Sequence, residues 1–191
     1  MRSLNVMIVG VGGQGTLLAS RVLGAAMIAS GYDVKVSEVH GMSQRGGSVV
    51  TYVRAGEKVY SPIVNMGEAD IILAFEQLEA ARWLPYLKKE GRLITSTQQI
   101  DPMPVVTGAA KYPEDVLKAI RAAGAELVTV DALRLAIEAG SVKAVNIVLI
   151  GVMARQTDIQ KEVWLEAIRS TVPSRFLEMN LKAFEAGYTA E

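Results

Sequence analysis

The sequence predicts a three-layer α/β sandwich with a predominantly parallel, mixed sheet. Two observations support this prediction. Strand-like apolar runs alternate with helix-forming stretches along most of the chain, and the C-terminal third, residues 142–187, has helical patterns throughout. A chain of 191 residues has the size of one domain, and such a domain buries about 70% of its unfolded surface without disulfides. We therefore treat residues 1–191 as a single domain.

The first predicted elements are a strand, a helix and a second strand. The strand begins at Asn5 and leads, through a group of glycines, into a helix over residues 16–30 that is rich in Ala, Leu and Met. Residues 33–39 alternate between apolar and polar side chains, which is typical of a half-buried strand. Residues 48–54 and 58–64 are strand-like and flank three turn residues, so they predict a β-hairpin. The hairpin makes the sheet mixed.

A crossover unit follows the predicted hairpin. Residues 70–75 form an apolar run of the kind that is buried on both faces of a sheet, and a helical pattern at 76–89 leads to a strand at 92–96. Pro85 predicts a kink or break in that helix, because its ring removes a backbone donor. The other predicted elements are an irregular stretch at 97–112, a helix at 113–124 with Pro113 in its first position, a strand at 126–130, a helix at 131–140, and two or three helices interrupted at 157–159 and at Pro173.

Charge and composition limit the classes of partner. The 20 Lys and Arg residues balance 20 Asp and Glu residues, which argues against a nucleic acid or an anionic membrane as partner. The absence of Cys fits a reducing compartment and excludes cysteine-ligated iron–sulfur clusters from this chain. The most apolar stretch, residues 144–154, is shorter than the roughly 20 residues that span a bilayer. We expect a cytoplasmic protein whose partners are small molecules or proteins.

The glycine loop, residues 10–15, is the first candidate site. Gly10, Gly12 and Gly15 have the G-x-G-x-x-G spacing, and together with Gly13 they allow a phosphate to approach the backbone at the N-terminus of the following helix. The strand before the motif and the helix after it predict a Rossmann-like anion site. Gln14 is a candidate contact for a phosphate or a carbonyl group, or it ties down the turn. The alternative for the glycines is that they only close a tight strand-to-helix turn.

The RGG loop, residues 40–47, is the second candidate site. It contains a dense set of polar residues and glycines: His40, Ser43, Arg45, Gly46 and Gly47 are the candidates. Arg45 beside two glycines is suited to present its guanidinium to a phosphate or a carboxylate. His40 is the candidate for general acid or base catalysis, because imidazole titrates near neutral pH. The alternatives are a surface arginine at a bulge and a histidine that hydrogen-bonds within the loop; a lone histidine without Cys predicts no metal site.

Two further features leave alternatives open. Glu38 ends the second predicted strand, where a dinucleotide-binding domain places a carboxylate on the ribose, so an NAD(P)-binding oxidoreductase or nucleotide-sensing module is the second interpretation. The chain departs from that pattern because a loop and a hairpin follow the strand in place of a crossover helix.

Asn146, in an apolar helix, is expected to tether a nearby loop rather than contact a ligand. Trp83, Trp164 and Phe75 are expected in the core or at an interface.

The two loops together resemble the gamma-type subunit of the thiamine-diphosphate-dependent 2-oxoacid:ferredoxin oxidoreductases. The resemblance extends nearly from end to end and rests on GVGGQG, RGGSV, Val53 with Arg54, the helix of Asn146 and the tail NLKAFEAGY. Within the family, EVHGMSQRGG is most similar to the beta subunit of indolepyruvate ferredoxin oxidoreductases, whereas pyruvate-type members have a different residue at His40 and an acidic one near Gln44.

The resemblance implies a function as a non-autonomous enzyme subunit. The family oxidatively decarboxylates a 2-oxoacid to an acyl-CoA and passes electrons through iron–sulfur clusters to ferredoxin. This chain has neither the G-D-G…Asn pattern for thiamine diphosphate nor Cys, so a larger alpha subunit is implied as the carrier of both cofactors. The resemblance implies that this chain helps to bind coenzyme A through residues 12–15. Arg45 would be the countercharge, and Ser43 and His40 would be secondary contacts. A structural scaffold with an empty glycine loop is the third interpretation.

Overall fold

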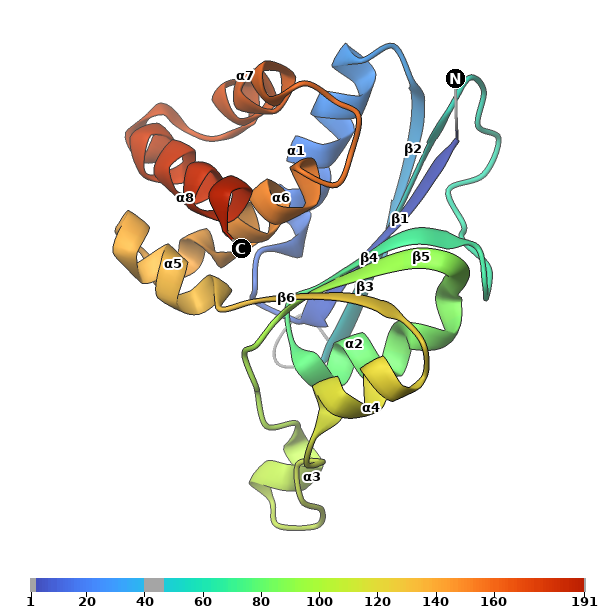
Figure 1. The fold of residues 1–191 in the computed structure, drawn as a ribbon. Coiled ribbons are helices and arrows are strands. Elements are labelled where there is room, and N and C mark those ends of the chain that lie inside the picture. Colours follow the sequence, from blue (N-terminus) through green and yellow to red (C-terminus); the bar gives the residue numbers. More distant parts are fainter. Residues whose placement is uncertain (1–2, 40–46, 191) are drawn as a thin grey trace.

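The computed structural model describes residues 3–39 and 47–190, and it has a mixed six-stranded sheet with helices on both faces (Figure 1). The strand order is β2-β3-β1-β4-β5-β6. The strands are β1 (Leu4–Val11), β2 (Asp33–Glu38), β3 (Ser48–Gly56), β4 (Ala69–Ala74), β5 (Leu87–Ser96) and β6 (Glu126–Val130). β3 is antiparallel to both of its neighbours, while β1, β4, β5 and β6 are parallel. The predicted three-layer, predominantly parallel sandwich is confirmed.

The predicted β-hairpin is wrong. β3 pairs with β1 on one side and with β2 on the other, so neither of its edges is left for a strand at residues 58–64. Among the described residues, 57–68 contain no strand; side chains of the sheet hold this segment instead. Arg54 Nη1 donates to the carbonyl of Ile63 at 3.0 Å, and the Val59 N–H donates to Asp33 Oδ2 at 2.8 Å. The sheet is mixed because β3 is inserted between two strands that run in the opposite direction.

Two helical layers of unequal thickness cover the sheet, and α3 projects away from the body (Figure 1). The thicker layer contains α1 (Thr16–Ala29), α5 (Ala132–Ala139), α6 (Val145–Ala154), α7 (Lys161–Thr171) and α8 (Leu177–Thr189). The opposite face carries α2 (Gln77–Trp83) and α4 (Val116–Ala122); α3 spans Met103–Val106. Separate apolar clusters fill the two sides of the sheet. In the described part of the chain, no helix is both long and apolar enough to cross a bilayer.

α6 is buried along its whole length because it lies between the sheet and α8. The two helices approach closely enough to require glycine on both. A Cβ atom on Gly187 would lie 1.9 Å from the carbonyl oxygen of Val148, and one on Gly151 would lie 2.3 Å from that of Phe184. The apolar stretch at residues 144–154 is therefore a central core helix of the thicker layer, as its length predicts.

Element boundaries differ from the prediction at two prolines. The helix at 76–89 ends at Trp83, Pro85 lies in a 3₁₀ turn, and β5 begins at Leu87, so the predicted break is confirmed and the strand is longer than predicted. The position predicted for Pro113 is wrong, because α4 begins only at Val116, after Asp115 in a left-handed conformation. The predicted C-terminal breaks are confirmed: α6, α7 and α8 are separated around 157–159 and at Pro173.

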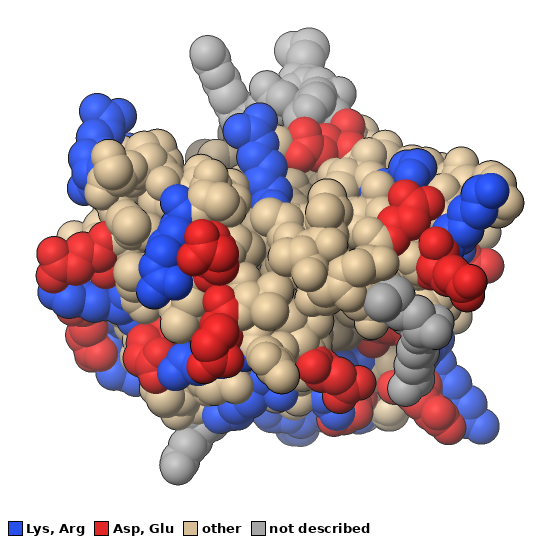
Figure 2. Space-filling view, turned by 90° about the horizontal axis from the view of Figure 1, so that it is seen from above, with Lys and Arg blue, Asp and Glu red and all other residues tan. Residues whose placement is uncertain are grey.

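Surface charges agree with the balanced composition. Figure 2 shows blue and red side chains interspersed over the face that it presents, with tan residues between them. On the surface of the described residues, charged side chains form local pairs on helices, such as Arg134 with Glu138 at 2.7 Å and Lys182 with Glu178 at 2.9 Å. This face therefore has the mixed charge that the net charge of zero predicts.

Candidate ligand site at the carboxyl edge of the sheet

The glycine loop and the end of the RGG loop meet at the carboxyl end of β1. Val11 at the end of β1 is paired with Ser48 at the start of β3, so the loops adjoining these residues lie at the same edge. The backbone N–H of Gly12 donates to the carbonyl oxygen of Gly47 at 2.9 Å. The glycine loop and the end of the RGG loop therefore meet at this contact. The candidates His40, Ser43, Arg45 and Gly46 lie outside the described residues.

The glycine loop has a backbone conformation that favours glycine at two positions. Gly13 has φ of 101° and Gly15 has φ of 84°, both in the left-handed region. Gly15 is the N-cap of α1, and no described side chain caps this helix or places an acidic group in its first turn. The N-terminus of α1 therefore presents its positive dipole end to the loop, as an anion site requires.

Gln14 stabilises the glycine loop through both ends of its amide. Its Oε1 accepts the N–H of Val11 at 2.8 Å, while its Nε2 donates to the carbonyl of Phe75 at 3.1 Å and to Oε1 of Gln98 at 3.4 Å. Both amide hydrogens therefore have partners within the protein. These contacts show that Gln14 ties down the turn, which is one of the two roles expected from the sequence. A direct contact with a ligand stays a prediction.

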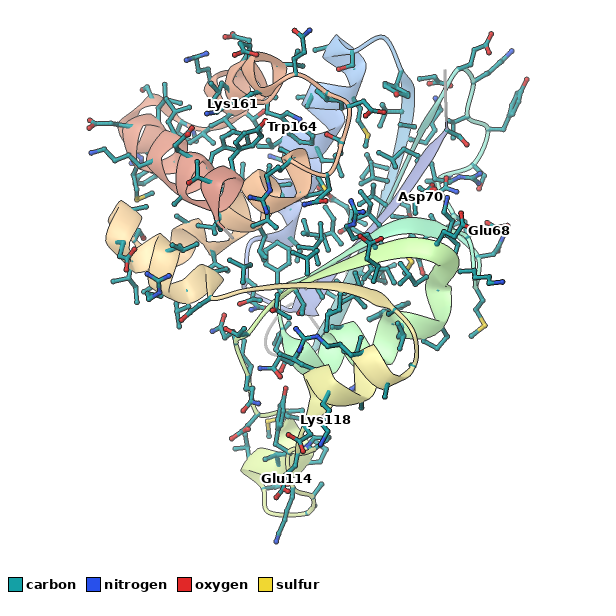
Figure 3. All side chains as sticks on the ribbon, viewed as in Figure 1. Glu68, Asp70, Glu114, Lys118, Lys161 and Trp164 are labelled. Atoms are coloured by element: carbon teal, nitrogen blue, oxygen red, sulfur yellow. The ribbon has the colours of Figure 1, made fainter. Side chains whose placement is uncertain are left out.

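Asn146 tethers the glycine loop to the helical layer, as predicted. Its Nδ2 donates to the carbonyl of Gly15 at 3.1 Å, and its Oδ1 accepts the N–H of Ile147 at 2.8 Å. A Cβ atom on Gly15 would lie 2.8 Å from the same Nδ2, so this contact also requires glycine. Phe75 and Trp164 are fully buried in the core, and Figure 3 shows Trp164 within the thicker helical layer.

A cavity of about 340 Å³ opens beside the glycine loop on the α1 side of the sheet. It is lined by Gly12, Gly13, Gly15, Thr16, Leu17, Glu38, Val39, Val49 and Thr51. Glu38 thus lies in the same cavity as the glycines, and its carboxylate accepts a hydrogen bond from Ser20 Oγ at 2.9 Å. β2, which ends at Glu38, is separated from β1 by β3, whereas a dinucleotide-binding domain places the corresponding strands side by side.

Two buried glutamates, Glu76 at the N-cap of α2 and Glu79 in its first turn, form a network that was not among the residues predicted from the sequence. Glu76 accepts the N–H of Glu79 at 2.9 Å, the N–H of Ile100 at 3.3 Å and the hydroxyl of Tyr112. The pKa of Tyr112 is raised above its usual range. Burial is the largest cause, and the hydrogen bond to Glu76 is the second largest. The sequence signal was available: two acidic residues three positions apart follow a buried strand at its carboxyl end.

Glu79 connects α2 to the strand that follows the RGG loop. Its carboxylate accepts hydrogen bonds from the hydroxyl of Ser48, from Trp83 Nε1 at 3.3 Å and from Arg82 Nε at 3.1 Å. Ser48 is the first residue of β3 and follows Gly47 directly. The network therefore holds the end of the RGG loop in place against the glycine loop.

A larger cavity of about 480 Å³ lies at the opposite edge of the sheet. It is lined by residues at the amino ends of β1, β4 and β5, including Leu4, Asp70 and Arg92. Figure 3 shows Asp70 at that edge, away from the loops. Asp70 is paired with Lys88, and Arg92 is paired with Glu126 at 2.5 Å. Ligands of parallel sheets bind at the carboxyl ends of strands, so we place the candidate site at the two loops.

Comparison with known families identifies the chain. The family model described as pyruvate ferredoxin/flavodoxin oxidoreductase matches residues 5–190. The chain belongs to this family. Among curated members it is 45% identical to indolepyruvate oxidoreductase subunit IorB of Thermococcus kodakarensis, over 100% of this chain and 96% of the relative. It is 44% identical to IorB of Pyrococcus horikoshii, with the same coverage, and 28% identical to the common gamma subunit of the pyruvate/ketoisovalerate oxidoreductases of Pyrococcus furiosus, over 94% of this chain and 92% of that subunit.

Solved structures of oxoacid:ferredoxin oxidoreductases contain the same fold. The gamma subunit of a keto/oxoacid ferredoxin oxidoreductase from Geobacter sulfurreducens has a TM-score of 0.73 at 24% identity, over 97% of this chain and 96% of that one. The 2-oxoglutarate:ferredoxin oxidoreductase from Magnetococcus marinus has a TM-score of 0.75 at 20% identity. That match covers 98% of this chain but only 31% of the longer one.

Family membership determines the general role of the chain. It is a subunit of a 2-oxoacid:ferredoxin oxidoreductase of the indolepyruvate type, and members of this family act as parts of multi-subunit enzymes. The comparisons therefore favour the first of the three interpretations drawn from the sequence.

Proposed function

We propose that this chain binds the diphosphate of coenzyme A at the glycine loop of an indolepyruvate-type oxidoreductase. In the assembled enzyme, a 2-oxoacid with an aryl side chain loses carbon dioxide, its acyl group passes to the thiol of coenzyme A, and its electrons pass to ferredoxin. This chain supplies binding groups and part of the active-site wall. A larger alpha subunit supplies thiamine diphosphate and the iron–sulfur clusters.

The hydrogen bond between Gly12 and Gly47 is the observation that carries this proposal. It joins the two glycine-rich segments at the N-terminus of α1, beside a cavity of about 340 Å³. A diphosphate placed there meets backbone N–H groups and the positive end of the helix dipole. Arg45 is the proposed countercharge, and Ser43 and His40 are proposed secondary contacts. His40 is also the proposed group for proton transfer.

The cofactors of the reaction are assigned to the partner because the residues of this chain do not fit them. The chain has no Cys to ligate an iron–sulfur cluster. It also lacks the glycine, acidic and asparagine pattern that holds the magnesium and diphosphate of thiamine diphosphate. The oxidoreductase from Magnetococcus marinus, in which a domain of this fold is part of a longer chain, was solved with coenzyme A bound.

Paired variants of Thr16 test coenzyme A binding in the assembled enzyme. Thr16 lines the cavity as the first residue of α1, whose first turn has no acidic residue. Thr16→Glu places a negative charge where the diphosphate binds, so we expect the KM for coenzyme A to rise about tenfold or more. A carboxylate near a helix N-terminus favours the helix, so the fold is retained. Thr16→Gln, which has the same shape without the charge, is the matched control; equal KM values for both variants would contradict the proposal.

The need for a partner subunit is tested separately. The isolated chain is expected to show no oxidation of indolepyruvate and to gain this activity when it is combined with the subunit that carries the cofactors. The measurement is reduction of ferredoxin with indolepyruvate and coenzyme A present. Oxidation of indolepyruvate by the isolated chain would contradict the proposed division of roles.

Binding of NAD(P) is the second candidate function, because Glu38 lies in the same cavity as the glycine loop. Titration of the full chain with NADH and with coenzyme A, followed by the heat of binding, separates the two functions. Tight binding of NADH that is lost in Glu38→Ala would favour the dinucleotide. Binding of coenzyme A alone supports the primary proposal.

A further inference from the structure

A second cavity of about 220 Å³ lies on the α2 side of the contact between Gly12 and Gly47. Most of its wall is apolar, formed by Val11, Leu78, Ile100, Pro102, Met103 and Pro104. The polar lining includes two buried carboxylates, Glu76 at 1% and Glu79 at 4% exposure. Arg82, whose side chain is 53% exposed, also lines the cavity. The cavity thus combines apolar walls, two buried acceptors and one exposed guanidinium.

The two carboxylates that line the cavity retain acceptor capacity. A carboxylate has about four lone-pair sites. Described donors reach Glu76 from Glu79, Ile100 and Tyr112, and they reach Glu79 from Ser48, Arg82 and Trp83. One site on each carboxylate therefore has no donor among the described residues. A ligand that brings an N–H or O–H group can occupy it.

Charge determines which part of a ligand fits this cavity. A phosphate or a carboxylate is repelled from the interior by two buried negative charges. A cation is disfavoured by the apolar walls and by Arg82, whose Nε already lies 3.1 Å from Glu79 Oε1. An uncharged group that carries a donor meets neither obstacle. Proline, methionine and guanidinium groups also pack well against flat aromatic rings.

We propose that this cavity binds a planar, uncharged aromatic ring that donates an N–H group to Glu76 or Glu79. The proposal rests on the proposed function, whose substrates contain two rings of this chemistry: the adenine of coenzyme A and the indole of the 2-oxoacid. The ring enters from the carboxyl edge of the sheet, next to the glycine loop. The cavity is a binding subsite separate from the diphosphate site on the α1 side.

The wall formed by residues 100–104 is held in place before a ligand binds. Glu76 accepts hydrogen bonds from both ends of the projecting segment, at Ile100 and at Tyr112. Its other oxygen accepts the N–H of Glu79 in the first turn of α2. One buried carboxylate thus fixes the base of this segment against α2, so the ring does not have to order it.

Two matched variants on α3 test the ring subsite in the enzyme assembled with its cofactor-bearing subunit. Met103 and Val106 are both 65% exposed and lie in the same short helix, but only Met103 lines the cavity. Met103→Trp fills the cavity, whereas Val106→Trp places the same side chain outside it. Both variants are expected to keep the fold, because each position is exposed. Circular dichroism and the melting temperature check this.

The Michaelis constants identify the ring. If the cavity takes adenine, Met103→Trp raises the KM for coenzyme A about tenfold and leaves that for indolepyruvate unchanged. If it takes indole, the KM for indolepyruvate rises instead. In both cases Val106→Trp changes neither value, and Met103→Gln, which removes apolar wall without adding bulk, gives a smaller rise in the same constant.

Unchanged constants in Met103→Trp, or equal rises in the two Trp variants, would overturn the ring subsite. If Thr16→Glu still raises the KM for coenzyme A, the proposed function stands without it.

Discussion

Asn146 in α6 donates a hydrogen bond of 3.1 Å to the carbonyl of Gly15, which precedes it by 131 residues. This single contact joins the core of the helical layer to the loop at the start of α1. Because Asn146 is only 3% exposed, water cannot replace its partner. The geometry of the glycine loop therefore depends on packing far away in the sequence.

Replacing Asn146 is expected to destabilise the fold and loosen the loop. Asn146→Ala removes this hydrogen bond and the side-chain acceptor of the Ile147 N–H, which costs about 1 kcal/mol of unfolding free energy. The Gly15 carbonyl keeps the N–H groups of Leu18 and Ala19 as donors, so the expected loss is moderate. The measurement is equilibrium unfolding in urea. Asn146→Leu serves as comparison, because a leucine side chain has nearly the same size but donates no hydrogen bond. Wild-type stability in both variants would show that the tether contributes nothing.

Gly187 in α8 is expected to tolerate no side chain. A Cβ atom there would lie 1.9 Å from the carbonyl oxygen of Val148, which is backbone and cannot rotate away. Gly187→Ala should therefore separate α6 from α8 and lower the unfolding free energy by about 3 kcal/mol or more. Gly24→Ala is the control, because nothing lies within 4 Å of its Cβ position in α1. Alanine there is expected to be neutral or to stabilise by up to about 1 kcal/mol. Similar losses in both variants would contradict the close contact.

Glu79 is expected to be needed for the position of β3. Glu79→Ala removes the acceptor of the half-buried Ser48 and Trp83 and of the exposed Arg82, so a loss of about 1–2 kcal/mol is expected. Ser48→Ala removes only one of these donors and should cost less. Thermal unfolding of the two variants and of the double variant measures the coupling. Additive losses would show that the two residues do not interact.

Tyr112 gives the fold a dependence on alkaline pH. Burial and the hydrogen bond to Glu76 raise the pKa of its phenol in the folded state. The neutral form is therefore favoured by folding, and this contribution is complete below the pKa of the unfolded phenol, about 10. It is lost as the pH rises above that value toward the folded pKa. Stability should thus fall more steeply with alkaline pH in the wild type than in Tyr112→Phe. Parallel curves of unfolding free energy against pH would contradict this assignment.

The sequence predicts those features that depend on local pattern. Alternating apolar runs and helical stretches predict the layers, and the glycine spacing after the first strand predicts the turn in which Gly13 and Gly15 have positive φ. The break at Pro85 and the buried strand at residues 70–75 follow from the residues themselves. These features require only interactions within a short segment, so they can be predicted without knowledge of the fold.

Errors occurred where long-range pairing competes with local preference. Residues 58–64 have the composition of a strand, but both edges of β3 are already occupied by β1 and β2. Pro113 suits the first turn of a helix, yet α4 begins after Asp115, whose φ is 54°. The pair of glutamates on α2 resembles an ordinary exposed face until the tertiary structure buries both. A local pattern does not contain these neighbours.

The sequence by itself determined the fold class, the two glycine-rich loops and the resemblance to a family, because each depends on residues in one segment or on the order of segments. The tertiary structure decided that the Gly12 N–H meets the Gly47 carbonyl, that Asn146 holds Gly15, and that Glu76 and Glu79 line a second cavity. The physical reason is that buried polar groups must find partners, and the fold determines which groups, distant in the chain, become those partners.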